Sequence, residues 1–441
     1  MSLAPPRRVV ITGLGVVAPN GIGKDNFWHA CIDGRSGVRA ITRFDASTLP
    51  SRIAGEVADF DPEQWDLTTE EITHLDRATQ FALAASHMAL LDARFPTAPD
   101  EAERERIGVL MGSAMACLEA GEAAWASMHR TPAHIEKDPH HAEKEYAEKA
   151  HIEPRHMPLL MSHASASSIA AHHHLYGPCS VIATGCSAGA DAIGQAFWLI
   201  QEGRTNCMLA GGTDAAISYG TQDVFCVMGA LSTAYNEEPQ RASRPYDAKR
   251  DGFVMAEGAG VIVLEEREKA LARGAHIYAE ITAFASNCNA YHMTSLPREG
   301  VPLRDLLTQI LGESKLTMVD YINSHGSSTP PNEIAETATY KAVFGANAYH
   351  IPISATKSLI GHTQGAASAI EVIVTALILD QQIIPPTINQ EYSDPHCDLD
   401  YVPNHARPAA VNVALTHSSG FGGVNSALIL AKPDRMVDDK H

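Results

Sequence analysis

Basic side chains are scarce in this 441-residue chain relative to acidic ones. Lys and Arg number 33 against 52 Asp and Glu, which gives a formal net charge of −19 at pH 7. Nucleic acids and anionic membrane surfaces attract proteins that carry an excess of cations, so wholesale binding to either is excluded. An acidic partner would have to dock on a local basic patch.

Two further absences narrow the class of protein. No two of the eight cysteines form a CxxC pair, so the sequence shows no zinc or iron–sulfur framework, and reduced, mostly buried thiols are expected. No apolar run reaches about 18 residues, so we predict no transmembrane helix. Residues 1–8 contain no apolar signal core, and a cytoplasmic location is expected. The cysteines are Cys31, Cys117, Cys179, Cys186, Cys207, Cys226, Cys288 and Cys397.

The pattern of apolar runs predicts an α/β fold. The length suits two fused halves better than one ordinary core. Strands and helices alternate along the chain, which favours a mainly parallel sheet. The same order of elements recurs in the second half, which indicates an ancient duplication. Strands are predicted from Val9 onward and at 107–111, 181–183, 207–210, 260–265, 278–285, 319–324, 412–416 and 426–431, and helices at 24–33, 76–93, 187–200, 303–313 and 365–379.

Residues 129–156 are unusual because histidines stand there among many Glu and Lys residues. We interpret this segment as a helical surface excursion, since histidines on a solvated face need no ligand. A metal site or a pH sensor is the alternative. The run His172–His174 continues a predicted helix, so its three side chains point in different directions and do not form a chelate.

Cys186 has the most informative setting in the chain. The apolar run 181–183 predicts a buried strand before it, and 187–200 predicts a helix after it. A cysteine at such a corner lies at the helix N-terminus, where unpaired N–H groups and the helix dipole favour the thiolate. Gly185 and Gly189 allow another backbone or a thioester to approach closely. Taken alone, a buried structural cysteine is the commoner explanation.

Three more loops, covering 323–330, 356–362 and 417–425, make joint sense with Cys186 as one active site. Each loop follows a strand or precedes a helix, and in an α/β sheet such loops can converge at one end. A cysteine can form a covalent thioester, and two histidines beside it can stabilise charge on a second substrate. The glycines around Phe421 leave backbone N–H groups free, as an oxyanion hole requires.

These motifs resemble those of the β-ketoacyl-acyl-carrier-protein synthases of the II type, over essentially the whole chain. The ketosynthase α subunit of type II polyketide synthases is a similar sister group. The resemblance implies an α/β thiolase-like fold, in which duplicated βαβαβαββ halves form a layered αβαβα core. We expect the halves at 1–267 and 268–441, with a longer insertion around 117–160. The matching strings are VVITGLGVVAPNG, ASRPYDAKRDGFVMAEGAGVIVLEE (242–266), NAYHMTS (289–295), HCDLDYVP (396–403) and FGGVNSALILAKP.

The resemblance implies an acyltransferase that performs a decarboxylative Claisen condensation in fatty-acid or type II polyketide elongation. Cys186 is expected to take an acyl chain from a carrier protein. His325 and His362 are expected to bind the thioester carbonyl of malonyl-carrier protein and to stabilise the enolate left by CO2. The enolate then attacks the acyl-Cys186 thioester, while the backbone N–H groups of Cys186 and Phe421 hold the oxyanion. Lys357 is expected to orient the histidines.

Further residues take expected roles from the same resemblance. Glu371 is the expected ionic partner of Lys357, and Phe421 is expected to swing as a gate between acylation and condensation. The hydroxyls of Ser327 and Thr329 are expected to bond the phosphopantetheine arm. Met115 and Phe225 are expected to line the acyl pocket, and plain core packing is an equal alternative for both. Gly422 and Gly423 are expected to adjoin the substrate at the gate.

The expected partners are an acyl carrier protein and a second subunit. We expect no metal and no cofactor, because the substrates are carried on phosphopantetheine. Relatives are dimers, so the chain is expected to form a homodimer, or a heterodimer with a chain-length-factor-like subunit. Ser327 and Val424 stand where threonine is usual, and Gly229 replaces a basic residue common in relatives. The carrier must then meet a different basic surface or a partner subunit, which favours a specialised secondary-metabolism enzyme.

Three alternatives are weighed against this interpretation. A non-catalytic partner subunit would lack the nucleophile, whereas Cys186 and both histidines are present. A partner-dependent ketosynthase subunit of a heterodimeric polyketide synthase stays open as the alternative. A thiolase would carry a second catalytic cysteine in its late glycine motif, where Phe421 stands. A cysteine hydrolase would need a carboxylate or amide to orient its base, and no such motif is seen.

Overall fold

The computed structural model describes residues 6–96, 100–115, 118, 121, 122, 161–294, 297 and 299–433. Apart from residues 118, 121 and 122, the expected insertion at 117–160 lies outside these residues. The predictions of a helical excursion, a metal site or a pH sensor at 129–156 therefore concern residues outside the described part of the chain.

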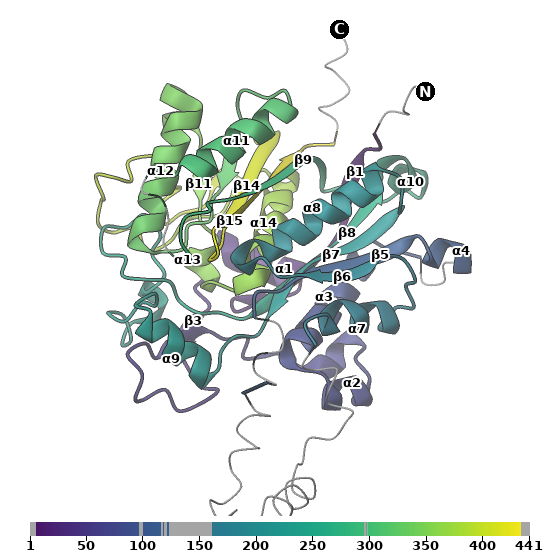
Figure 1. The fold of residues 1–441 in the computed structure, drawn as a ribbon, viewed down its shortest axis with the longest axis horizontal. Helices are drawn as coiled ribbons and strands as arrows, with labels where there is room; N and C mark the ends of the chain where they lie inside the picture. The colour runs from purple at the N-terminus through teal and green to yellow at the C-terminus, as the bar shows by residue number, and fades with distance from the viewer. Residues whose placement is uncertain are drawn as a thin grey trace, which may run out of the picture.

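A single large sheet of 11 strands runs through the described chain (Figure 1). Its order is β11-β10-β14-β15-β9-β1-β8-β7-β5-β6, with β2 beside β1. Read outward from the β1–β9 junction, each half shows the same pairings: two antiparallel, then two parallel. This recurrence confirms the duplicated α/β architecture. The division between residues 267 and 268 stays a prediction.

The strand bounds lie close to the predicted ones. The larger strands are β1 (Val9–Ala18), β5 (Ile107–Gly112), β6 (Cys179–Ile182), β7 (Cys207–Asp214), β8 (Gly258–Glu266), β9 (Ala279–Cys288), β10 (Tyr321–Asn323), β14 (Val413–Ser419) and β15 (Val424–Ala431). Shorter strands are β2 (Gly21–Ile22), β3 (Val38–Ala40), β4 (Ile53–Gly55), β11 (Ile353–Ser354), β12 (Ile383–Ile384) and β13 (Arg407–Pro408).

The sheet is mixed, so the prediction of a mainly parallel sheet is wrong. Only β5 and β10 pair in parallel with both of their neighbours. For β14 and β15 the cause is their connection, which has only four residues, 420–423. A connection this short joins antiparallel strands, because a parallel crossover needs a dozen residues or more.

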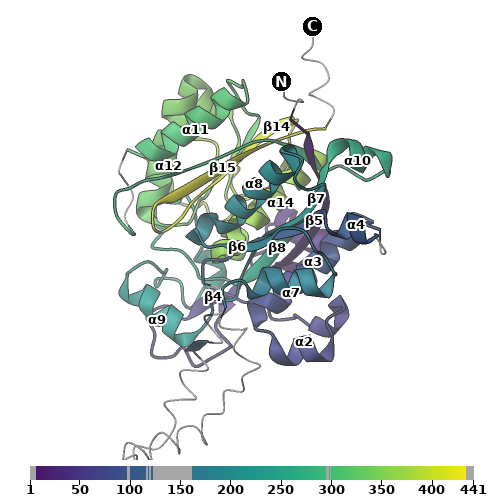
Figure 2. The same ribbon diagram turned by 45° about the vertical axis from the view of Figure 1, so that its right-hand side comes forward.

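Helices form layers on both sides of each half-sheet. Helices α8 and α14 contact each other and pack between the two halves, where Figure 2 shows them at the centre of the molecule. Helix α3 covers the outer face of β1 and β8, and α11 covers β9 and β15. The helices are α1 (Lys24–Ile32), α2 (Thr69–His74), α3 (Arg77–Asp92), α4 (Glu101–Arg104), α7 (Ala164–His172), α8 (Ala188–Gln201), α9 (Tyr219–Val227), α10 (Arg267–Ala272), α11 (Val301–Glu313), α12 (Pro330–Phe344), α13 (Lys357–Ile360) and α14 (Ala367–Gln381).

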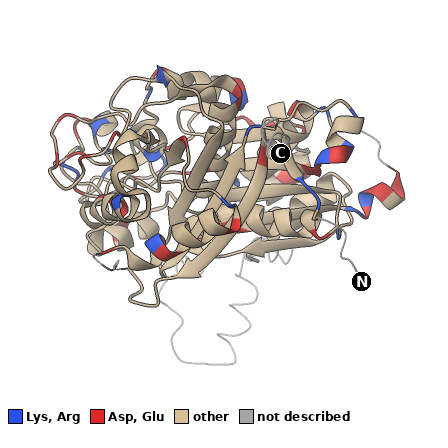
Figure 3. Ribbon diagram, turned by 90° about the horizontal axis from the view of Figure 1, so that it is seen from above, with Lys and Arg blue, Asp and Glu red and all other residues tan. Residues whose placement is uncertain are grey.

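The central layer of helices lies in the hydrophobic core. All but two of the residues of α14 are buried, and its mean character is strongly apolar, as a helix enclosed on all sides requires. Charged residues lie mostly in the outer helices and loops, while the strands across the middle of Figure 3 carry few. Among the described helices, none is both long and apolar enough to cross a membrane.

Strand β6 corrects one expectation about the nucleophile corner. The apolar run before Cys186 was expected to be a buried strand, but Cys179 and Ser180 are exposed and Val181 and Ile182 are half-buried. The reason is topological, because among the described residues β6 pairs only with β5 and its other edge has no strand beside it. The prediction that the run 172–174 continues a helix is wrong after His172, where α7 ends, and the rings of His172 and His173 are in edge contact with centroids 4.7 Å apart. These two side chains have different partners, since His172 binds Glu71 and His173 binds Ser86.

Candidate active site

The Cys186 corner is held in place by a glycine. Residues Gly185–Ser187 form a short 3-10 turn (η3) that leads into α8. Gly185 has φ +62°, in the left-handed region, and a Cβ atom there would lie 3.2 Å from the Phe421 carbonyl oxygen. A glycine therefore allows the turn to place Cys186 against the loop that contains Phe421.

Burial controls the state of the Cys186 thiol. Desolvation raises the pKa of Cys186 to about 11, and the Lys357 charge and the Phe421 backbone N–H offset this only in part. Burial therefore outweighs the groups that favour the Cys186 thiolate. The cause is the low exposure of the sulfur, since desolvation disfavours the charged form.

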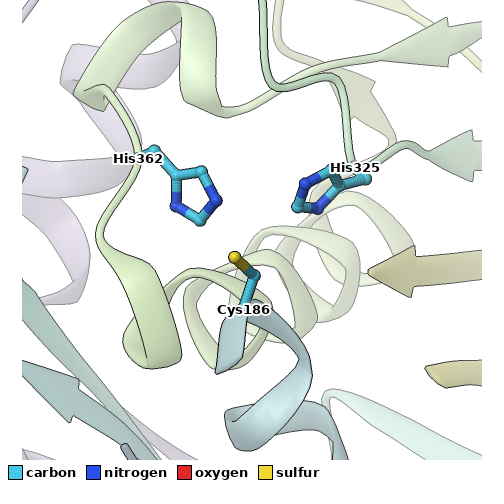
Figure 4. A group of neighbouring side chains, drawn as sticks. All are labelled: Cys186, His325 and His362. Atoms are coloured by element: carbon cyan, nitrogen blue, oxygen red, sulfur yellow. The ribbon is translucent and has the colours of Figure 1, made fainter. Parts of the chain in front are cut away.

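Two histidines face the thiol from the other half of the molecule (Figure 4). His325 follows β10, and His362 follows α13. One ring nitrogen of each histidine and the Cys186 Sγ atom all lie within 4.8 Å of one another. The two ring centroids are 5.4 Å apart. The same donor types bind Zn²⁺ in other proteins, so this is also the place where an adventitious metal would block the thiol.

Hydrogen bonds hold both imidazoles and fix the tautomer of His362. The Nδ1 atom of His362 accepts the Gln364 backbone N–H at 3.1 Å. The Nδ1 atom of His325 lies 3.3 Å from Lys357 Nζ, which has only protons to offer. Burial and the Lys357 charge hold the pKa of both imidazoles well below the ordinary value. Both rings are thus neutral, and His362 carries its proton on Nε2, as a hydrogen-bond donor.

Lys357 lies beneath the histidines in a buried ion pair. Its Nζ atom donates to the His325 carbonyl oxygen at 2.7 Å and pairs with a carboxylate oxygen of Glu371, on α14. Both side chains are 1% exposed. Burial raises the pKa of Glu371 to about 7, and the Lys357 charge opposes that rise. The predicted Lys357–Glu371 partnership is present.

The glycine loop between β14 and β15 shows which N–H groups are free. Gly422 donates to the Met293 carbonyl oxygen at 2.6 Å, and Gly423 donates to that of Gly420 at 3.0 Å. The Gly420 N–H is also paired, with Val424. Only the Phe421 N–H points to the Cys186 sulfur. The expectation that the glycine loop supplies several free donors is therefore wrong, since three of its four N–H groups are paired, two within the turn and one with Met293.

One cavity of about 760 Å³ contains most of the predicted site. Its lining includes Cys186, His325, His362, Ser327, Thr329, Phe421 and Gly423. The Ser327 and Thr329 hydroxyls are 2.9 Å apart, which presents two hydroxyls side by side.

Five predicted residues lie outside the lining of this cavity, namely the buried pair of Lys357 and Glu371, and Met115, Phe225 and Gly422. Phe225 stacks on Phe421 with ring centroids 6.2 Å apart, and Met115 packs against the apolar cluster that contains Phe225. Gly422 adjoins Phe421 on the gate loop. The Phe421 ring thus separates the open cavity from an apolar cluster, which is where a gate would stand.

Sequence reasoning missed three supporting residues. Phe253 packs edge-on against His362, with ring centroids 5.3 Å apart. Ser418 lies 3.1 Å from His325 Nδ1 and donates to the Cys186 carbonyl oxygen at 3.1 Å. Gln364 fixes the His362 tautomer. All three lie inside or directly beside strings already singled out, but no spacing rule indicates such contacts across the fold.

Comparison with known proteins gives the site a family context. The model described as "Beta-ketoacyl synthase, N-terminal domain" matches residues 6–270, and "Beta-ketoacyl synthase, C-terminal domain" matches residues 278–391. The chain is 42% identical to the tetracenomycin polyketide synthase ketoacyl synthase alpha subunit of Streptomyces glaucescens, over 97% of each chain. It is 40% identical to a 3-oxoacyl-[acyl-carrier-protein] synthase 2 of Synechocystis, over 97% of this chain and 98% of the relative.

Solved structures of ketosynthases are similar to this chain over almost its whole length. A type II polyketide synthase acyl-carrier protein in complex with its ketosynthase bound to the hexaketide matches with a TM-score of 0.85 and 36% identity, over 97% of this chain and 100% of that one. The ishigamide ketosynthase/chain length factor matches with a TM-score of 0.85 and 31% identity, over 97% and 99%.

Proposed function

The chain belongs to the β-ketoacyl synthase family, and we propose that it joins an acyl group held on Cys186 to malonyl-acyl carrier protein by decarboxylative Claisen condensation. Family membership makes it a condensing acyltransferase. One observation carries the assignment of residues: the Cys186 sulfur and the ring nitrogens of His325 and His362 lie within 4.8 Å of one another in a single cavity.

Acylation uses the thiol and the gate loop. The Cys186 sulfur attacks the thioester carbonyl of the acyl carrier, a new carbon–sulfur bond forms, and the bond to the carrier's pantetheine sulfur breaks. The thiol proton ends on that pantetheine sulfur, so the exchange is balanced. The Phe421 N–H already points at the Cys186 sulfur, and it is placed to stabilise the oxyanion that forms beside it.

Decarboxylation uses the two histidines. Their Nε2–H groups hydrogen-bond the carbonyl oxygen of the malonyl thioester, and the bond to the carboxylate carbon breaks to release CO2. The electron pair remains as an enolate, whose oxygen charge the two donors stabilise at about 3 kcal/mol each. Because both pKa values are held low, the rings donate hydrogen bonds without becoming general acids.

Condensation closes the cycle. The enolate carbon attacks the acyl-Cys186 carbonyl, the carbon–sulfur bond breaks, and Cys186 leaves as a thiolate that then takes up a proton. Lys357 lies on the far side of His325 and supplies a fixed positive charge near both rings. We propose that Ser327 and Thr329 hold the arm, and that Met115 and Phe225 limit the acyl chain behind Phe421.

The partners follow from the family. We propose that the acyl carrier protein delivers both substrates on phosphopantetheine, with no separate cofactor, and that the chain acts in the cytoplasm. A second chain completes the molecule, and the open edge of β6 offers unpaired backbone groups for it. Sequence identity does not distinguish a polyketide pathway from fatty-acid synthesis, because it is 42% to the polyketide relative and 40% to the 3-oxoacyl synthase. Gly229 at the cavity supports a specialised pathway with a heterodimeric partner.

Intact-protein mass after incubation with a panel of acyl-carrier proteins tests this function. We expect an acyl adduct on the peptide that contains Cys186, and none in Cys186→Ala. Cys288→Ala is the matched control, because Cys288 is an exposed thiol beside the gate loop. An adduct that survives Cys186→Ala and disappears in Cys288→Ala would overturn the assignment.

A further inference from the structure

Asp214 ends strand β7 as a fully buried side chain whose carboxylate is surrounded by hydrogen-bond donors. It accepts four hydrogen bonds, one from a hydroxyl and three from backbone N–H groups. The donors are Ser113 Oγ at 2.7 Å, Ala114 N at 2.8 Å, Met115 N at 3.0 Å and Gly365 N at 2.6 Å. A carboxylate that accepts from four donors has its lone pairs filled.

These donors come from two loops that are far apart in sequence. Residues 113–115 follow β5 in the first half of the chain, and Gly365 lies in the 3-10 turn η6 (Gln364–Ala366) in the second half. The loops are in backbone contact, because a Cβ atom at Gly365 would lie 2.5 Å from the Ala114 nitrogen and 2.8 Å from Asp214 Oδ2. Asp214 thus holds η6 against the end of the first half-sheet.

The turn η6 begins with a residue in an unfavourable backbone conformation. Gln364 has φ +53°, in the left-handed region that few side chains adopt. Such a conformation persists only where the surroundings hold it. The Gln364 N–H donates to His362 Nδ1 at 3.1 Å, and the next N–H along the chain is the one that Asp214 accepts. The Gln364 side chain contacts only the Met255 sulfur, which is a weak acceptor.

We propose that Asp214 is a positioning residue for His362. By holding the Gly365 N–H, it keeps Gln364 in the left-handed conformation, and the Gln364 N–H in turn keeps the His362 proton on Nε2. The inference rests on the proposed function, in which that Nε2–H stabilises the enolate oxygen. Asp214 does not line the catalytic cavity. Its charge also contributes to the raised pKa of Cys186, so the acylation step is measured separately.

Asp214→Asn tests this role, because an amide cannot accept from four donors and its NH2 group would face backbone N–H groups that have nothing to accept with. We expect CO2 release from malonyl-acyl carrier protein to fall about 10- to 100-fold, and Cys186 acylation to change less than about threefold. Nitrogen-15 NMR of the His362 ring, assigned by comparison with His362→Ala, should show the Nδ1–H tautomer. An unchanged His362 tautomer in folded Asp214→Asn would overturn the proposal, whatever the rate.

Asp191→Asn is the matched control. Asp191 is also a buried carboxylate of the first half, but its partners are the hydroxyls of Thr184 and Ser426. A hydroxyl can rotate to accept from an amide, so we expect CO2 release to change less than about threefold and the His362 tautomer to stay as in the wild type.

A second background separates positioning from a general loss of structure. Glycine adopts the left-handed conformation without strain, so Asp214→Asn should lower CO2 release less than about threefold when it is added to Gln364→Gly. If Asp214→Asn does not fold, this comparison replaces it, and a His362 tautomer that differs between Gln364→Gly and the double variant contradicts the proposal. Unfolding of both variants that carry Asp214→Asn would make Asp214 a residue of the fold alone, which also contradicts it.

The NMR measurement keeps this proposal distinct from the proposed function. If the wild-type chain releases no CO2 from malonyl-acyl carrier protein, the proposed function fails, while the His362 tautomer still shows whether Asp214 positions the ring.

Discussion

The floor of the catalytic cavity and its mouth differ in burial and in the freedom of the backbone. At the floor, Lys357 and Glu371 are 1% exposed, and the imidazoles above them have their Nδ1 atoms engaged. At the mouth, Phe421 is 39% exposed and is followed by two glycines at φ +85° and +81°. The floor is fixed before substrate arrives, as electrostatic stabilisation requires. The mouth has one large side chain on a permissive backbone, which suits entry and exit.

This difference assigns chemistry and selection to separate parts of the site. Charge that develops during decarboxylation meets donors whose orientation is already set by Gln364 and Lys357. In the proposed function the acyl chain meets Phe421 and Phe225, whose aromatic side chains carry no charge. Changes at the floor should therefore alter rates strongly for every substrate, and changes at the mouth should alter which substrate is preferred.

The largest expected effect is at the floor, in Lys357→Met. Removing the cation leaves Glu371 buried without its partner, which typically costs roughly 3–5 kcal/mol of unfolding free energy. Urea unfolding measures this loss. The double variant Lys357→Met/Glu371→Gln should recover most of the stability but not the condensation activity. Recovery of both would show that the ion pair serves only the fold.

His325→Ala and His362→Ala come next. Each removes one donor to the enolate, so malonyl decarboxylation should fall about 10²- to 10³-fold. Cys186 acylation should change far less, because the oxyanion of that step lies at the Phe421 N–H. Release of CO2 and intact-protein mass report the two steps separately. Equal losses in both steps would contradict the division of roles.

The pH dependence of the thiol is the third test. Because burial raises the pKa of Cys186 to about 11, the thiolate fraction is small at neutral pH and increases about tenfold per pH unit below that value. The rate of Cys186 alkylation by iodoacetamide should therefore increase about tenfold per unit from pH 7 to 10, after subtraction of the rate in Cys186→Ala. A plateau below pH 9 would mean that the pKa of the Cys186 thiol lies near that of an exposed cysteine. This result would contradict the expected effect of burial.

Phe421→Ala gives the smallest effect and belongs to the mouth. Its backbone N–H is retained, so acylation by short chains should stay within about threefold of the wild-type rate. Loss of the ring that stacks on Phe225 removes the barrier between the cavity and the apolar cluster. Competition between short and long acyl donors should show reduced discrimination. Unchanged discrimination would indicate that Phe421 is not a gate.

The sequence predicted the floor better than the mouth. Cys186, His325, His362 and Lys357 are chemically distinctive residues at the ends of predicted elements, and the fold brings them together. The recurrence of element order likewise predicted the two matching half-sheets. Apolar periodicity and loop position indicate the loops that carry these residues, and the family resemblance supplied the role expected of each.

What the sequence did not predict depends on contacts across the fold. The exposure of β6 depends on its position at the sheet edge, and the mixed strand directions depend on the β14–β15 turn. The raised pKa of Cys186 arises from residues that enclose it from both halves. The pairing of Gly422 with Met293 joins segments far apart in sequence. Burial and partner choice are set by tertiary packing, which no local pattern specifies.

One measurement tests the central claim that the floor performs its chemistry independently of the nucleophile. We would measure CO2 release from malonyl-acyl carrier protein by Cys186→Ala, and by Cys186→Ala/His325→Ala. The account predicts that Cys186→Ala retains decarboxylation within about tenfold of wild type but makes no carbon–carbon bond, and that the double variant loses a further factor of about 100 or more. Loss of CO2 release in Cys186→Ala alone, with the protein folded, would contradict it.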